Sequence, residues 1–369
     1  MNSMRSKIIA TALLAAATAG PLSAQLPEGI IPTPDEPPTR QGTRGANFLQ
    51  IGVGARAAAM AGALTSLVEG PTAWYWNPAG AAATEQFSFS AARQELYTGL
   101  DITHSFFGVS LPFLGGVIGA NFVGLNSGEL LRTTEDNPAG GDPILGSTFE
   151  WRSTSVGVGY ARRLTDRLDL GLAVKRVDEG IDDAKVNWMA IDVGTQFRTG
   201  LYGLTLGASL QNVGPSARAR GSLIQRKINS DDFALERTDV EFGTKETELP
   251  TLFRFSVGSD LYGGSGALLG QTDTRNSLLA ELAFSDAIDT DIQLGFGLEY
   301  GFNNMFFLRG GKRFYNDDRE FGSSKMKYGL SAGAGLRIPI SSRSFRLDYA
   351  YTSLGELDNV QVFSFEFGR

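Results

Sequence analysis

Apolar and polar residues alternate along most of the chain after Gln86. In 203–211, leucines and an alanine hold one parity, while glycine, threonine, serine and glutamine hold the other. The segments 292–301, 327–338 and 345–352 repeat this pattern. One apolar and one small or polar face over about 9–11 residues is typical of strands in a transmembrane barrel. Lipid cannot hydrogen-bond a backbone, so only a closed sheet satisfies every amide and carbonyl there.

Fourteen such segments can be counted, an even number as bacterial barrels require. They are 86–92, 101–113, 116–124, 150–162, 167–178, 187–199, 201–212, 251–261, 276–285, 289–301, 304–314, 326–338, 343–352 and 359–367. The sequence therefore predicts an all-β fold, a transmembrane antiparallel β-barrel over 86–369.

The links between these segments differ in length, which predicts an orientation. Most even-numbered strands are followed by short turns, whereas the links after strands three, seven and eleven are long and polar. Short turns are expected in the periplasm and long loops outside the cell. The link 262–275 departs from this rule and is either a larger periplasmic turn or a counting error.

A soluble β-sandwich with regular short strands is the alternative fold. The strand count disfavours it, and so does the final strand. There Phe363, Phe365 and Phe367 alternate close to the chain end, which looks like the assembly signal of outer-membrane barrels. The match is imperfect, because Gly368 and Arg369 follow the last aromatic residue.

The first 24 residues read as a cleaved secretory signal peptide. Arg5 and Lys7 supply a positive start, 8–19 is uncharged and mostly apolar, and 22–24 ends in a small residue. The apolar run is shorter than the ~20 residues of a spanning helix. An uncleaved anchor is the alternative. Residues 25–45, rich in proline, glycine and threonine, are expected to form a flexible lead.

Composition narrows the function classes. Without Arg5 and Lys7 the formal charge of −7 becomes −9, and no basic block is present, which argues against a nucleic-acid partner. The chain has no cysteine, so a disulfide scaffold and a Cys-ligated metal are excluded. The 46 glycines suit places where the facing volume is limited, as inside a barrel. We expect no cofactor.

Candidate catalytic and metal-binding residues are few. His104 is the only histidine and its parity in strand two points it to the lumen, without a G-x-S-x-G elbow anywhere in the chain. We therefore expect no enzyme. The acidic pairs 182–183, 231–232 and 317–318 fall in predicted outer loops and could bind Ca²⁺. None has EF-hand spacing, so solvated loop charge is the preferred interpretation.

Residues 46–85, small and apolar, precede the first strand and predict a plug packed inside the barrel. Within them 56–67 could form one alanine-rich helix. The turn Asn77-Pro78-Ala79-Gly80 follows Trp74-Tyr75-Trp76, and buried Trp and Tyr side chains need partners for their polar atoms. The same four-residue turn at 137–140 lies in a polar loop, where an ordinary turn explains it.

The plug carries a resemblance to a known family. The segment Ala46-Asn47-Phe48-Leu49-Gln50-Ile51-Gly52, then Gly54-Ala55-Arg56-Ala57, Met60-Ala61-Gly62-Ala63 and the turn at 77–80 resemble the start of PorV/PorQ proteins. These belong to the superfamily of the FadL long-chain fatty acid transporter. Ala61 departs from the family, which usually has glycine there.

The resemblance implies a fourteen-stranded barrel closed by its N-terminal segment. Asn77, Pro78, Ala79 and Gly80 would then seat the plug, a structural role more than direct ligand contact. Arg56 would be a buried cation facing acidic lumen residues, for which Glu281 and Glu299 are candidates.

Three functions remain open at this stage. The PorV-like hypothesis is a shuttle of type IX secretion that binds secreted proteins by C-terminal sorting domains, with loops 125–149 and 213–250 as the binding face. The FadL-like hypothesis is transport of hydrophobic small molecules or fatty acids across the outer membrane. The third is a structural role without a transported ligand. In each case the barrel would contact outer-membrane lipids.

Overall fold

The structure of the protein is a computed structural model. It describes residues 42–97, 99–135, 137–141, 146, 148–221, 225–228, 238–241, 244–264, 266–269, 275–315, 329–353 and 359–368. The expected signal peptide 1–24, most of the lead 25–45, and the acidic pairs 231–232 and 317–318 lie outside these residues.

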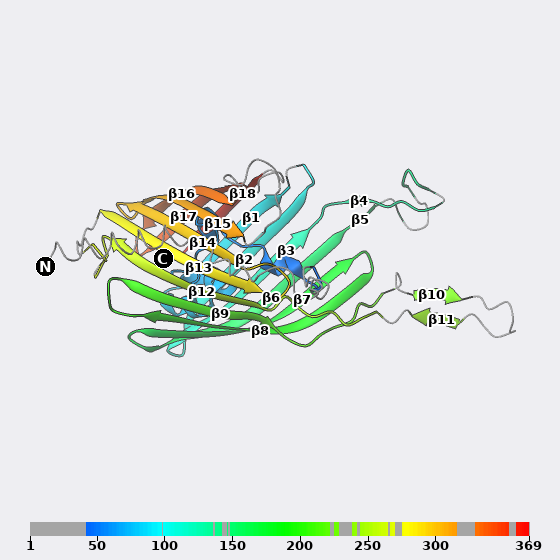
Figure 1. Ribbon diagram of the computed structural model, residues 1–369, viewed down its shortest axis with the longest axis horizontal. Helices are drawn as coiled ribbons and strands as arrows, with labels where there is room; N and C mark the ends of the chain where they lie inside the picture. Colours follow the sequence, from blue (N-terminus) through cyan, green and yellow to red (C-terminus); the bar gives the residue numbers. More distant parts are fainter. Residues whose placement is uncertain are drawn as a thin grey trace, which may run out of the picture. The chain divides into compact units, whose positions relative to one another are not determined.

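Fourteen antiparallel strands close into one barrel (Figure 1). Around the wall they run β1-β18-β17-β16-β15-β14-β13-β12-β9-β8-β7-β6-β3-β2. Their bounds are β1 Ser88–Leu96, β2 Ile102–Phe113, β3 Gly116–Asn126, β6 Trp151–Thr165, β7 Leu168–Ile181, β8 Ala184–Arg198, β9 Leu204–Val213, β12 Leu252–Tyr262, β13 Asn276–Ala287, β14 Gln293–Phe302, β15 Phe306–Tyr315, β16 Leu330–Ile340, β17 Arg343–Ser353 and β18 Asn359–Phe367. Each strand overlaps one predicted segment, so the predicted fold is confirmed and the sandwich is excluded.

The two ends of the barrel differ in their connections. At the short-turn end, β2 meets β3 and β16 meets β17 through two-residue turns, 114–115 and 341–342. At the long-loop end lie the links 127–150 and 214–251. The segment after β12 joins β13 at the short-turn end, so the doubtful link 262–275 is a larger turn and the strand count was right.

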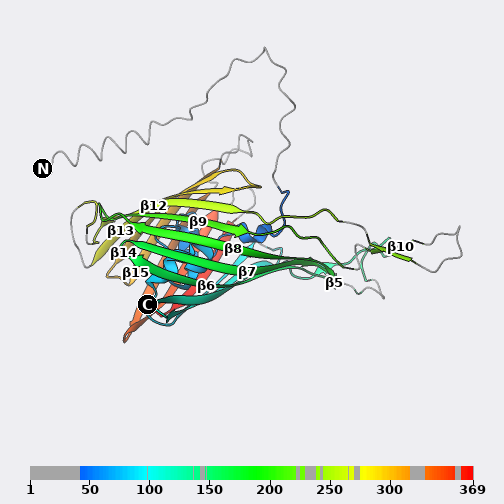
Figure 2. The same ribbon diagram turned by 90° about the horizontal axis from the view of Figure 1, so that it is seen from below.

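Two small hairpins belong to the long links. β4 (Leu130–Leu131) pairs with β5 (Thr148–Phe149), and β10 (Gln225–Ile228) pairs with β11 (Thr238–Glu241). Both extend beyond the barrel strands on the same side, as the two views of Figures 1 and 2 show. The neighbouring strands β6 and β8 are also long, at 15 residues each, against 10 for β14 and β15.

The alternation seen in the sequence corresponds to the two faces of the wall. In β14 the exposed positions Leu294, Phe296 and Leu298 alternate with buried Gly295 and Gly297. A bare apolar outer face is stable only in lipid, since water would not solvate it favourably. No helix in the described part of the chain is long and apolar enough to cross a membrane.

The plug, residues 46–85, lies inside the wall and crosses the lumen. It begins at the long-loop end, where the amide of Ala46 donates to Glu179 at the end of β7. It leaves at the short-turn end, where Gln86 approaches Ser342 in a turn. Its elements are η1 Asn47–Gln50, α2 Ala55–Ala59, η2 Gly70–Thr72, α3 Ala73–Trp76 and η3 Pro78–Ala83.

The predicted helix over 56–67 is wrong in its extent. Helix α2 ends at Ala59, and the next turn places Ala61 and Gly62 at positive φ, 55° and 80°. The carbonyl of Ala61 accepts a hydrogen bond from Nε of Arg313 on β15, 3.1 Å away. The left-handed conformation at Ala61 costs a non-glycine residue about 1–2 kcal/mol, which gives a physical reason for the expected glycine.

Candidate functional site in the barrel lumen

Glycines on the inner face of the wall make room for the plug. A Cβ added to Gly194 would lie 2.0 Å from Oδ1 of Asn77, and one on Gly119 would lie 2.1 Å from Nε1 of Trp74. Similar approaches under 3 Å involve Gly159, Gly171, Gly207, Gly258, Gly295, Gly297, Gly311 and Gly333. The wall glycines therefore follow the path of the plug, as expected for residues facing a limited volume.

Asn77 joins the two halves of the plug to the wall. It is fully buried, and its side-chain amide donates to the carbonyls of Thr65 and of Thr195 in β8, both at 2.9 Å. Its Oδ1 accepts from the amide of Ala79 at 3.2 Å and so caps η3. Pro78 occupies the first turn of η3, where a missing N–H is tolerated.

The rest of the turn is equally enclosed. Ala79 and Gly80 are buried, and a Cβ on Gly80 would lie 2.2 Å from the carbonyl oxygen of Val68. Gly171 of β7 would bring a Cβ to 2.2 Å from the carbonyl carbon of Pro78. The turn thus packs directly against the wall. Whether it also contacts a ligand remains a prediction.

The three aromatic residues before the turn satisfy their polar atoms inside the lumen. Nε1 of Trp74 donates to Oγ of Ser110 at 2.9 Å, and Nε1 of Trp76 donates to the carbonyl of Val53 at 3.0 Å. The hydroxyl of Tyr75 lies 2.9 and 2.8 Å from the carbonyls of Leu49 and Ile51. The aromatic segment therefore connects the plug to β2 and to its own first turn.

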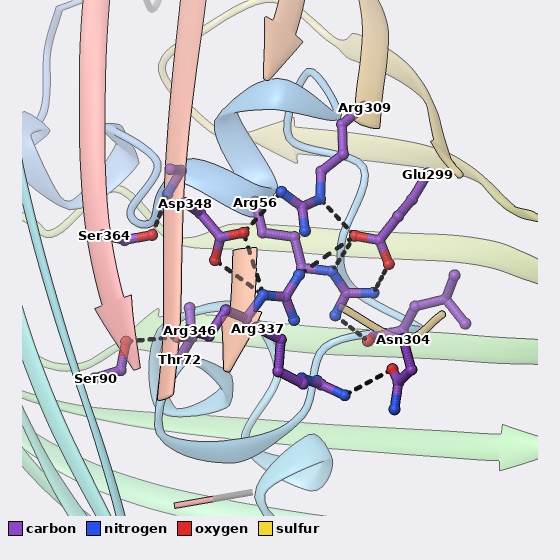
Figure 3. A network of polar contacts seen from close by, with 12 residues as sticks. Arg56, Thr72, Ser90, Glu299, Asn304, Arg309, Arg337, Arg346, Asp348 and Ser364 are labelled. Atoms are coloured by element: carbon purple, nitrogen blue, oxygen red, sulfur yellow. Dashed lines mark hydrogen bonds and ion pairs between the residues drawn. The ribbon is translucent and has the colours of Figure 1, made fainter. Parts of the chain in front are cut away.

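Arg56 forms a two-point ion pair with Glu299 of β14 (Figure 3). Its Nε lies 2.9 Å from one carboxylate oxygen and its Nη2 lies 2.9 Å from the other. Burial lowers the pKa of Arg56, but the charge and hydrogen bonds of Glu299 outweigh it, and the net shift is upward. The side chain stays charged, and the prediction that it faces Glu299 is confirmed.

Glu281 has a different role from the one suggested. Its carboxylate accepts the backbone amides of Thr65 and Ser66, both at 2.7 Å, and that of Leu67 at 3.3 Å. It is 1% exposed. The suggestion that Glu281 pairs with Arg56 is therefore wrong, because three plug amides already occupy the carboxylate.

Two further arginines complete the network around Glu299. Nε of Arg309 lies 2.5 Å from Glu299, and its Nη1 lies 2.8 Å from Asp348. Arg346 reaches Asp348 at 3.0 Å. Three guanidinium groups thus share two carboxylates next to helix α2, to which Arg56 belongs (Figure 3). We call Arg56, Glu299, Arg309, Arg346 and Asp348 the latch.

Sequence reasoning missed Arg309, Arg346 and Asp348. The available signal was parity, since all three occupy the small or polar face of a predicted strand, where a charge points inward. Arg254 of β12 was also missed, although it too lies on the inward-facing side of a predicted strand. Its guanidinium lies 4.7 Å from the centre of the Trp76 ring, a cation–π distance.

A cavity of about 650 Å³ lies beside the latch near the short-turn end. Its lining includes Arg56, Arg337 and Arg346 together with the β14–β15 turn, 303–305. Phe307 adds an apolar wall, and the guanidinium of Arg346 lies 4.7 Å from its ring centre. The latch therefore forms one side of a partly open space between plug and wall.

The remaining candidates lie apart from this cavity. His104 is buried and faces the lumen as expected, with Nδ1 2.7 Å from Nε2 of Gln94. The pair 182–183 forms the turn between β7 and β8, where Asp182 contacts Arg132. At 137–140 an ordinary turn is confirmed by the bond from Gly140 to Asn137, 3.0 Å. No group of three acidic or histidine side chains among the described residues could hold a metal.

Comparison with solved structures identifies barrels of the same fold. The crystal structure of the Pseudomonas putida toluene transporter TodX is 12% identical, with TM-score 0.53, over 86% of this chain and 96% of that one. The TodX deltaS2S3 mutant, described as a monoaromatic hydrocarbon channel, is also 12% identical, with TM-score 0.51, over 86% and 97%. A Pseudomonas aeruginosa FadL homologue has TM-score 0.46, with 12% identity over 85% and 97%.

No protein-family model and no curated protein matches the chain. At these identities the likeness concerns the fold. The TodX barrels share the fold of this chain, and neither the family models nor the curated proteins support the narrower PorV/PorQ assignment.

Proposed function

We propose that this chain is an outer-membrane channel for hydrophobic small molecules, such as monoaromatic hydrocarbons or fatty acids, and that its plug is the gate. It would reach that membrane after removal of residues 1–24. The proposal ranks FadL-like transport above the secretion role preferred from the sequence.

One observation carries the proposal. The lumen of a TodX-like barrel is filled by a plug that is attached by discrete polar contacts. Glycines on the inner wall make room for this plug, and the latch concentrates its charges at helix α2. A molecule passing along the lumen requires the plug to move, and the cavity beside Arg56 offers space next to helix α2.

The gate can be tested by locking it. Oγ1 of Thr72 in the plug and Oγ of Ser90 in β1 lie 3.3 Å apart, so two thiols placed there are close enough to form a disulfide after small adjustments. The chain has no cysteine of its own, so Thr72→Cys with Ser90→Cys introduces the only pair. Figure 3 shows this contact.

The readout is uptake of radiolabelled toluene and oleate by Gram-negative host cells that lack a channel of this type. We expect the unmodified chain to raise uptake several-fold above the empty host. The oxidised double variant should return to the host level and recover after reduction with dithiothreitol. Each single cysteine variant is the control and should transport normally under both conditions.

Two outcomes separate the parts of the proposal. If the unmodified chain gives no uptake above the host level for either compound, the transport function is wrong. If uptake is present but the oxidised double variant matches the unmodified chain, the plug is not the gate at this contact.

A second candidate is the binding of secreted proteins at the long-loop end. The hairpins β4–β5 and β10–β11 favour it, because they project beyond the barrel strands and present surface away from the lumen (Figure 2). Leu131 in the first hairpin is 59% exposed. Co-purification of secreted proteins that share a C-terminal domain, lost when 129–149 is replaced by a short glycine–serine turn, would support this role. A lipid-only eluate would exclude it.

A further inference from the structure

The outer wall carries an apolar groove that neither transport nor the plug explains. It has a volume of about 600 Å³ and crosses β1, β18, β17 and β16 on the outside of the barrel. Ala91 and Ala334 provide small positions in it, whereas Phe363, Leu347 and Tyr349 are large and exposed around them. A groove of this size interrupts the apolar outer wall at one place, and a concave apolar surface is the shape that binds small apolar ligands.

An arginine lies at this groove. Arg93 belongs to β1, where buried Ala92 and Gln94 flank it, so its side chain points outward. It pairs in register with Phe363 of β18, whose side chain is 60% exposed. Arg93 stands three residues before the end of β1 at the long-loop end, which places it toward one surface of the membrane and away from the short turns.

No protein group neutralises Arg93 within the described part of the chain. The outward Arg176 on β7, by contrast, holds Asp178 at 2.9 Å. Glu95 occupies the next outward-facing position of β1, two residues closer to the long-loop end. No ion pair joins Glu95 and Arg93 among the described residues. An unpaired cation on a lipid-facing wall is costly unless an anion meets it. The anion available at that surface is the phosphate of a membrane lipid.

We propose that this groove binds one phosphate-bearing membrane lipid, with the phosphate on Arg93 and an acyl chain along Ala91, Ala334 and the aromatic side chains. Guanidinium and phosphate form two parallel hydrogen bonds, which gives the head group a fixed position. The acyl chain fills the apolar part. The proposal depends on the barrel lying in a membrane and not on what passes through its lumen.

Native mass spectrometry on the full barrel tests this, with phosphatidylglycerol as the probe and diacylglycerol with the same tails as the phosphate-free comparison. Arg93→Gln should weaken phosphatidylglycerol binding about fivefold, the effect of one basic residue at a membrane surface. Arg93→Lys should retain part of it, because the ammonium keeps the charge but not the two parallel hydrogen bonds. The matched control is Arg162→Gln, because Arg162 is also outward and exposed but lies near the short-turn end of β6, away from the groove.

A second variant tests the groove itself. Ala91→Phe fills a small position on the outer face and should weaken phosphatidylglycerol and diacylglycerol alike, while barrel assembly, checked by heat-dependent migration on a gel, stays normal. Arg93→Gln should leave diacylglycerol binding unchanged. Equal losses in Arg93→Gln and Arg162→Gln, no loss in Arg93→Gln, or unchanged binding in Ala91→Phe would each overturn the proposal.

Discussion

Arg56 of the plug and Glu299 of β14 meet in a two-point ion pair, with both nitrogen–oxygen distances at 2.9 Å. The carboxylate is 4% exposed. The Arg56 side chain is 20% exposed, so it is the carboxylate that is withdrawn from water and depends on the guanidinium groups around it for compensation. This pair ties helix α2 to the wall and makes the latch the point where plug stability can be measured.

Replacing Glu299 with Gln should loosen the plug and leave the barrel intact. Removing one partner of a buried pair costs about 3–5 kcal/mol, and here Arg56, Arg309 and, at 3.6 Å, Arg346 lose a carboxylate. Hydrogen exchange should accelerate over 55–67 while the barrel strands stay protected. The control is Glu248→Gln, whose side chain pairs with Arg44 at 58% exposure and should have little effect. Unchanged exchange over 55–67 would contradict the role of the latch.

Asn77→Asp should destabilise the plug more than Asn77→Ala. The aspartate replaces an amide donor with an acceptor that faces the carbonyls of Thr65 and Thr195, whereas alanine only leaves them without a donor, a cost of about 1–3 kcal/mol. Limited proteolysis within 46–85 measures the difference. The repeated turn supplies a control, because Asn137→Ala lies in a loop and should not alter cleavage. Equal cleavage of the two Asn77 variants would refute this ranking.

Gly194→Ala should displace the plug, because the new Cβ would lie 2.0 Å from Oδ1 of Asn77. Overpacking of this kind costs about 1–3 kcal/mol. Gly310→Ala is the matched control on the wall, since its Cβ meets only the carbonyl oxygen of Ser331, at 4.0 Å. When amide hydrogen exchange of residues 46–85 is followed against temperature, the temperature at which half of their protection is lost should fall for Gly194→Ala only. A similar fall in both would mean that sheet propensity, not the plug, governs the effect.

Glu281→Gln should free the segment at Thr65–Leu67, because the neutral amide offers one acceptor oxygen where the carboxylate offers two. Charged acceptors bind backbone amides about twice as strongly as neutral ones. Amide exchange at 65–67 should rise, with Gln196→Ala as a comparison, since that side chain donates to carbonyls in the same plug region. If exchange at 65–67 rises only in the Gln196 variant, Glu281 does not hold this turn.

The alternating pattern alone was enough to determine the barrel. Period two leaves one apolar and one small face on every strand, and only a closed sheet in lipid accommodates fourteen of them, so each predicted segment overlaps a strand. The wall glycines and the parity of His104 were also readable, because side-chain direction in a strand follows from sequence position. The turn at Asn77 was recognisable as part of a packed plug because an ordinary exposed turn would not be preceded by three large aromatic residues.

The tertiary structure decided what the plug touches. The sequence alone allows Arg56 to face Glu281 or Glu299, because both occupy inward-facing positions of their strands. Which of them lies at the depth of Arg56 in the lumen depends on strand tilt and register. The helix expected over 56–67 stops at Ala59, where the amides of Ala61 and Gly62 bond back to the carbonyls of Ala58 and Ala57. Arg313 of the wall donates to the carbonyl of Ala61 in this left-handed turn, a contact that local propensity does not encode. The latch and the outer groove likewise join residues from strands far apart in the chain, and only closure of the barrel brings them together.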